Sequence, residues 1–136
     1  MYEKKIAIVL RDDLLNWQKL NVTSFLASSI AIAFPEVHGK TFSTKTEGEF
    51  LPFINQPILV YKADNGDIMR RVFNRSKERT LHIGIYPQTF FSTKSAEENH
   101  IVMEQFNNET VTLAGIIIYG ETQKVYKALD GLKLCD

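Results

Sequence analysis

Short apolar runs alternate along this chain with longer segments in which apolar residues recur at helical spacing. Residues 6–10, 57–61, 81–86 and 113–119 are the four main apolar runs, and charged or turn-forming residues bound them. Runs of this length that are rich in β-branched residues are typical of strands buried on both faces of a sheet. The alternation of strands and helical segments predicts an α/β fold in which helices cover both faces of the sheet.

The longest helical segment follows the first strand and runs from about Trp17 to about Phe34, where Pro35 ends it. Asp13 or Asn16 is expected to cap its start by accepting a hydrogen bond from a free backbone N–H. One side of the helix is apolar and carries Val22, Leu26, Ile30 and Ala33, extended by Phe25 and Ile32. The opposite side is narrow, polar and uncharged, and it carries Trp17, Asn21, Ser24 and Ser28. A solvated helix face usually carries Lys and Glu, so this side is predicted to have another role.

The remaining segments predict smaller elements. Residues 39–54 are expected to form a small exposed hairpin, and apolar positions between 68 and 76 predict a second helix. Two more helices are expected, one that contains Ile101 and Phe106 and a short one over about 122–129. The expected turn and cap residues are Gly48 in the hairpin, Asp67 and Ser95 with Glu98 at helix starts, and Gly131 at a helix end.

Length and composition favour one globular domain over residues 1–136, because a chain of this size buries enough surface without a metal or disulfide. The 16 basic and 16 acidic side chains cancel, which argues against a protein that binds nucleic acid along its whole surface. Cys135 is the single cysteine, and no Cys/His spacing suggests a metal or a cofactor. The apolar run at residues 6–10 is too short for a signal peptide or a membrane span, so a cytoplasmic location is expected.

The uncharged side of the long helix is the best candidate for a ligand site. Ligands of open α/β sheets collect outside the carboxyl ends of the strands, which is where Asp13 follows the first strand. A helix start there offers free N–H groups to an anion, while Trp17 could stack on a flat ligand and Asn21 could orient a polar one. The candidate ligand-binding residues are Asp13, Trp17, Asn21, Ser24 and Ser28, with Tyr119 after the fourth strand as a further one. Alternatively, Asp13 only caps the helix, the small residues pack against the sheet or a second subunit, and Tyr119 buries its ring.

A second candidate is a basic stripe on the second helix. Arg71, Arg75 and Arg79 are four residues apart, so on one helix they would lie on one side and could contact phosphates. A solvated helix face with cations near its C-terminus is the favoured alternative, since the chain has no net charge. The three histidines lie in different elements without ligand spacing, and none has an evident catalytic partner.

Two segments resemble known families. Ile8-Val9-Leu10-Arg11-Asp12-Asp13-Leu14 followed by a helix rich in small residues, and Ala114-Gly115-Ile116-Ile117-Ile118-Tyr119-Gly120 near the end, resemble type-2 peptidyl-tRNA hydrolases. Over essentially the whole chain the resemblance is closer to a family known as domain of unknown function 2000. Its helix is similar to the segment from Asp13-Leu14 through Asn21-Val22-Thr23-Ser24-Phe25-Leu26-Ala27, and Pro57-Ile58 and Tyr119-Gly120 fit too. The resemblance implies the hydrolases' three-layer α/β/α fold with a mixed four-stranded sheet.

The same helix departs from the hydrolases in its chemistry. Their helix opens with a Gly-Lys pair and an Ala-Ala-Gln run, whereas this chain has Trp17-Gln18-Lys19-Leu20-Asn21-Val22-Thr23-Ser24. Lys19 is the nearest substitute for the catalytic lysine, but it falls one position early, and one residue is 100° of helix. A small-ligand-binding or regulatory module is therefore the first hypothesis. A hydrolase of peptidyl- or aminoacyl-RNA esters and a homodimeric interaction protein are the alternatives.

Overall fold

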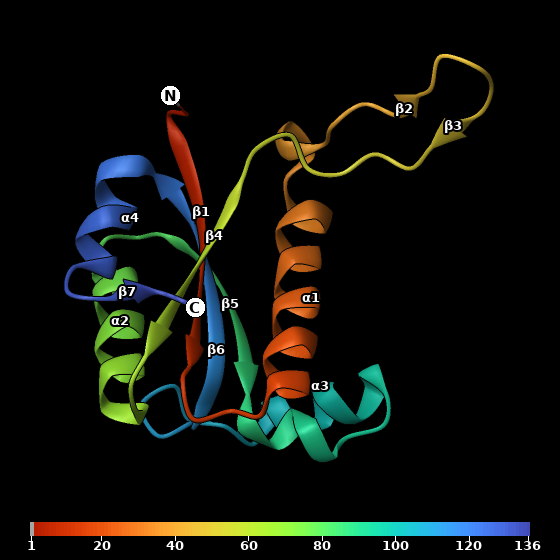
Figure 1. The fold of residues 1–136 in the computed structure, drawn as a ribbon. Helices are drawn as coiled ribbons and strands as arrows, with labels where there is room; N and C mark the ends of the chain where they lie inside the picture. The colour runs from red at the N-terminus through yellow and green to blue at the C-terminus, as the bar shows by residue number, and fades with distance from the viewer. Residues whose placement is uncertain (1) are drawn as a thin grey trace.

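The computed structural model describes residues 2–136 and has an α/β fold built on a mixed five-stranded sheet (Figure 1). The strand order is β5-β6-β1-β4-β7. β1 (Lys4–Arg11) is parallel to β4 (Ile58–Ala63) and antiparallel to β6 (Leu113–Glu121). β5 (His82–Pro87) is antiparallel to β6, and β7 (Lys133–Leu134) is antiparallel to β4. The carboxyl ends of β1, β4 and β5 therefore lie at the same edge of the sheet.

The prediction of a four-stranded sheet is wrong by one strand. Beyond Gly131, which has the predicted positive φ of 90°, the chain turns back and β7 pairs with Tyr61 and Lys62 of β4. The backbone N–H of Cys135 also donates to the carbonyl of Val60 at 2.9 Å. A strand of two residues is too short to give a periodic signal, and these hydrogen bonds fix the end of the chain to the sheet.

Helices lie on both faces of the sheet (Figure 1). α2 (Gly66–Glu78) and α4 (Thr122–Leu129) cover one face, where Val72 and Val125 are fully buried with Ile116 of β6. α1 (Asn16–Ala33) packs on the other face through Val22, Leu26 and Ile30. The shorter α3 (Ala96–Glu104) and the 3₁₀ helix η2 (Gln88–Ser92) lie beside the start of α1, at the carboxyl edge of the sheet. Within the described residues, no helix is long and apolar enough to cross a membrane.

Only part of the predicted apolar side of α1 faces the core. Val22, Leu26 and Ile30 are buried as predicted, but Phe25, Ile32 and Ala33 are exposed. The contact with the sheet is narrow because α1 lies close to two glycines. A Cβ at Gly115 would lie 2.7 Å from the Val22 Cγ1 atom, and a Cβ at Gly84 would lie 3.0 Å from the Ser29 Oγ atom. Val22, Leu26 and Ile30 form the contact with the sheet, and the apolar residues beside them on the helix stay outside the core.

The caps predicted for the starts of helices are correct in one case and wrong in two. Ser95 accepts the N–H of Glu98 at 3.1 Å, as the capping box requires. α1 is capped instead by Gln18, whose side chain accepts the N–H of Leu15, so neither Asp13 nor Asn16 has the predicted role. At the start of α2 the side chain of Asn65, rather than Asp67, accepts the N–H of Ile68. In both errors a neighbouring polar residue competes for the same free N–H groups.

A two-stranded arm extends from the end of α1. The 3₁₀ helix η1 (Pro35–Val37) leads into β2 (Phe42–Ser43), and β3 (Glu49–Phe50) returns the chain to β4. Gly48 has a φ of 91° at the turn, which confirms the predicted hairpin. Figure 1 shows this arm projecting away from the sheet and the helices.

Candidate functional site

A cavity of about 600 Å³ lies between α1 from Trp17 to Ser29, the end of β5, η2 and the start of α3. Its position agrees with the general tendency of α/β proteins to bind ligands beyond the carboxyl ends of their strands. The local sequence explains the opening. Pro87 ends β5, η2 turns the chain away, and α1 begins only five residues after β1 ends. The cavity is therefore enclosed by segments that lie far apart in the sequence.

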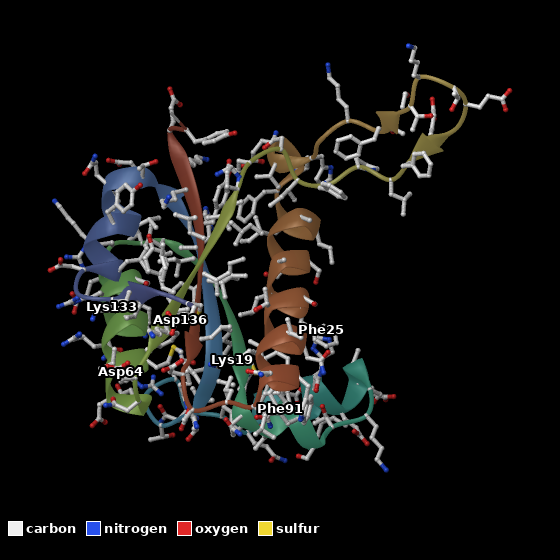
Figure 2. All side chains as sticks on the ribbon, viewed as in Figure 1. Lys19, Phe25, Asp64, Phe91, Lys133 and Asp136 are labelled. Atoms are coloured by element: carbon white, nitrogen blue, oxygen red, sulfur yellow. The ribbon has the colours of Figure 1, made fainter. Side chains whose placement is uncertain are left out.

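Five aromatic side chains line the cavity. Trp17 and Phe25 extend from α1, Tyr86 from the end of β5, and Phe90 and Phe91 from η2. The rings touch one another in edge-on or tilted pairs, the favourable geometry for aromatic contacts. The centroid distances are 5.9 Å for Trp17–Phe91, 6.0 Å for Phe25–Tyr86, 5.4 Å for Tyr86–Phe90 and 5.3 Å for Tyr86–Phe91. Figure 2 shows Phe91 near the start of α1 and Phe25 farther along the same helix.

Tyr86 is the most deeply placed of these aromatic residues, with 9% of its surface exposed. Within residues 2–136, no buried side-chain oxygen or nitrogen lacks a hydrogen-bond partner, and the Tyr86 hydroxyl bonds to no other described side chain or backbone group. The hydroxyl is therefore not closed off from solvent, and Tyr86 is one of the residues that line the cavity. Burial raises the pKa of Tyr86 above its ordinary value of 10.0, so at neutral pH it is an uncharged hydrogen-bond donor.

The polar part of the wall carries one charged residue. Lys94 lines the cavity next to Ser95, and no carboxylate lines it with them. Asn21 and Asn99 add side-chain amides, and the Asn99 oxygen is bonded by the Thr93 hydroxyl. A ligand would therefore meet aromatic rings, a phenol, an amide and an ammonium group. This set suits a flat ligand that carries a hydrogen-bonding oxygen or nitrogen, and the Lys94 ammonium group favours a negative charge close to it.

The residues predicted as one site from the sequence are divided between several places. Trp17 and Asn21 line the aromatic cavity. Ser28 lies farther along α1 in a second hollow, and Ser24 is exposed with its hydroxyl bonded to the carbonyl of Leu20. Tyr119 is 1% exposed, outside the aromatic cavity, and its hydroxyl donates to Glu36 at 3.3 Å. Trp17 and Ser28, the two ends of the predicted stripe, are eleven positions apart along α1 and line two different hollows.

Asp13 lies at the carboxyl end of β1 as predicted, but its carboxylate is occupied. It forms two hydrogen bonds with the Arg11 guanidinium, at 2.9 and 3.0 Å. Arg11 also donates to the side chain of Gln88 at 3.1 Å, which ties the end of β1 to η2. The Arg11 hydrogen bond lowers the pKa of Asp13, more than partial burial raises it. The pair thus helps to hold the segment that carries Phe90 and Phe91.

Lys19 does not line the aromatic cavity. Its ammonium nitrogen lies 3.1 Å from an oxygen of Asp12, and Figure 2 shows it between α1 and the sheet. Arg71, Arg75 and Arg79 lie on the opposite face, along and just beyond α2, and Arg75 donates to the carbonyl of Asp130 at the end of α4. In residues 2–136 there is no group of three or more His, Cys, Asp or Glu residues that could hold a metal ion.

The residues that sequence reasoning missed are mainly Phe25, Tyr86, Phe90 and Phe91. Phe90-Phe91 follows Pro87 and precedes the capping box at Ser95, outside every predicted strand and helix. An adjacent pair of large aromatic residues in a connection is the one signal that could have indicated them. Phe25 was expected to face the core, and Tyr86 is the last residue of a predicted strand, 81–86, with no signal that separates it from the rest of that strand.

Removal of the Tyr86 hydroxyl is expected to reduce the loss of folding stability that the unmodified chain shows at alkaline pH. Because burial raises the pKa of Tyr86, its contribution to the folded state is intact below about pH 10 and is lost as the pH rises through the folded-state value. Tyr86→Phe should therefore lose less stability than the unmodified chain between about pH 9 and pH 11, measured by urea unfolding. Tyr126→Phe, which removes a phenol from the exposed side of α4, is the control and should lose as much stability as the unmodified chain. If Tyr86→Phe also loses as much stability as the unmodified chain, this expectation is contradicted.

One comparison with known proteins identifies a family, and another identifies a solved structure with the same fold. The family described as protein of unknown function (DUF2000) matches residues 4–136. A solved structure of a protein of unknown function from Agrobacterium tumefaciens strain C58 is 34% identical in sequence, with a TM-score of 0.94 over 100% of both chains. None of the curated proteins matches this chain. The solved structure therefore has the same fold over its whole length.

Proposed function

This chain belongs to the DUF2000 family, and we propose that it is a small-molecule-binding or regulatory protein whose ligand is a planar compound held in the aromatic cavity. The observation that carries the proposal is the wall of five aromatic side chains around about 600 Å³. Ligand pockets typically have such volumes, and they combine apolar and aromatic walls with a few polar groups.

The polar groups of the wall narrow the class of ligand. A neutral phenol at Tyr86 donates to an oxygen or nitrogen acceptor on the ligand, and Asn21 can donate or accept beside it. Lys94 is the one charged residue in the wall and favours a negative charge near the opening. We infer a planar aromatic ligand with a carboxylate or carbonyl oxygen.

The single tryptophan makes the proposal directly testable. Trp17 lines the cavity and is the only tryptophan in the chain, so its fluorescence reports on this site alone. Three probes share a naphthalene ring and differ in charge: 2-naphthoate, 2-naphthamide and 2-(aminomethyl)naphthalene. We expect the naphthoate and the amide to bind more tightly than the amine, by calorimetry, and to change the Trp17 emission. At a hundredfold excess over its dissociation constant, a bound probe should also stabilise the fold by about 2.7 kcal/mol.

Two results would count against this function. If none of the three probes binds, the cavity is not a site for planar aromatic compounds. If a probe binds without any change in Trp17 emission, it occupies another part of the molecule. An amine that binds best would retain the site but contradict the charge preference inferred from Lys94.

We also infer that the fold is the three-layer α/β/α fold of the type-2 peptidyl-tRNA hydrolases, which the β1–turn–α1 opening and helices on both sheet faces support. Hydrolysis of peptidyl- or aminoacyl-RNA esters has less support than ligand binding. Lys19 is ion-paired with Asp12 away from the aromatic cavity, and the arginines on α2 lie across the sheet from it.

We also propose that the protein is located in the cytoplasm, which its single free thiol, Cys135, favours.

A further inference from the structure

The β2–β3 arm exposes an unusual amount of apolar surface. Every residue from 40 to 53 is exposed. Four of them are large and apolar: Phe42 at 46%, Phe50 at 58%, Leu51 at 85% and Phe53 at 72% exposure. The rings of Phe42 and Phe53 contact each other at 4.8 Å, but most of their surface remains open to water. Large apolar side chains that gather on one surface segment usually mark an interaction site.

The arm is fixed at its base and unsupported at its tip. The Gly39 N–H donates to the Phe53 carbonyl at 2.9 Å, and His38 forms an isolated bridge with Ile54. Beyond this point the ladder has two residue pairs, Phe42 with Phe50 and Ser43 with Glu49. A hairpin this small is marginally stable in water without further packing. Figure 1 shows that the sheet and helices of the same chain do not supply that packing.

A complementary surface lies on the outer side of α1. A hollow of about 490 Å³ beside the base of the arm is lined by Ala27, Ser28 and Ala31 of α1 together with Phe53 and Ile54. Ile32, one turn after Ser28, is 82% exposed. Residues 20–35 contain no charged side chain, although half of them are exposed. An exposed helix side without charges is typical of a surface covered by another chain.

We propose that a second copy of this chain covers these surfaces, with the arm of each copy packed along the outer side of α1 of the other. One molecule carries both the projecting apolar arm and the apolar hollow, so a two-fold dimer contains two identical contacts, each between the arm of one copy and the hollow of the other. The four arm residues and Ile32 expose on the order of 600 Å² per copy, close to the roughly 800 Å² per partner of a standard interface.

Charge also favours a second copy over a strongly charged partner. The arm carries two cations, Lys40 and Lys45, and two anions, Glu47 and Glu49. The whole chain has a net charge of zero, so two copies do not repel each other. The hollow itself contains no carboxylate and no lysine or arginine, and so it offers no ionic partner to a charged ligand.

The test is the mass of the unmodified chain in solution, measured by light scattering and by sedimentation between about 1 and 100 µM. We expect a dimer of the 15.6 kDa chain. Leu51→Asp on the arm and Ile32→Asp on α1 should each weaken dimerisation at least a hundredfold while leaving the circular dichroism spectrum unchanged, since both residues are largely exposed. Ile101→Asp, which adds the same charge to the exposed side of α3, should leave the dimer intact.

Three outcomes would overturn this proposal. A monomer throughout the concentration range excludes the dimer. A dimer that persists in both Leu51→Asp and Ile32→Asp uses another surface. A dimer that Ile101→Asp disrupts as strongly as Leu51→Asp responds to added charge rather than to the arm. None of these results bears on the aromatic cavity, whose probes are tested separately.

Discussion

Ile30→Ala is expected to lower the free energy of unfolding by about 2–5 kcal/mol. Ile30 is 3% exposed and belongs to the cluster through which α1 packs on the sheet, with Val22 and Leu26. Truncation removes three buried carbons and leaves a cavity that the sheet can fill only partly, because strands and helix already lie close at Gly115. Urea unfolding at fixed protein concentration measures the change, with circular dichroism as the signal.

Leu20→Ala is the matched control on the same helix. Leucine and isoleucine are isomers, so both variants lose the same atoms, but Leu20 is 70% exposed and lies outside the core. We expect its effect to stay within about 0.5 kcal/mol. Similar losses in the two variants would mean that α1 does not pack on the sheet through the side that contains Ile30.

The elements that sequence reasoning predicted well have a strong local signal. The runs that became β1, β4, β5 and β6 are long and apolar, and the turn glycines Gly48 and Gly131 adopt the positive φ that their positions require. The orientation of α1 was harder because apolar residues lie on all of its sides. Which of them face the core depends on Gly84 and Gly115, which lie about 60 to 90 residues away in the sequence. Helical periodicity contains no information about these tertiary contacts.

A smaller part of the candidate site was predictable for the same reason. Trp17 and Asn21 were identified because an uncharged stripe on a helix is visible in the sequence itself. Phe90 and Phe91 were missed because they lie in a connection, where no periodicity marks them, and they reach the cavity only through the packing of η2 beside α1. Asp13 was placed at the correct edge of the sheet, but its pairing with Arg11 depends on a side-chain geometry that residue spacing does not specify.

Trp17→Ala is expected to weaken the binding of 2-naphthoate by about 10- to 100-fold, since burying one large aromatic side chain against a ligand is worth about 1.5–3 kcal/mol. Trp17 is 53% exposed and contacts Phe91 at the mouth of the cavity, so its loss removes a wall of the site at little cost to the fold. Calorimetry is the suitable measurement, because this variant has no tryptophan fluorescence.

Leu20→Ala again provides the comparison, since Leu20 is an exposed apolar residue one turn from Trp17 that does not line the cavity. It should bind 2-naphthoate as the unmodified chain does. Equal weakening in both variants would show that the probe adheres to the exposed apolar side of α1, and unchanged affinity in Trp17→Ala would remove the indole from the site. Residues of α1 line both hollows, but Tyr86 lines only the one that also contains Trp17. A probe that depends on Trp17 but not on Leu20 is therefore in the aromatic cavity, within reach of a polar group that can select its oxygen.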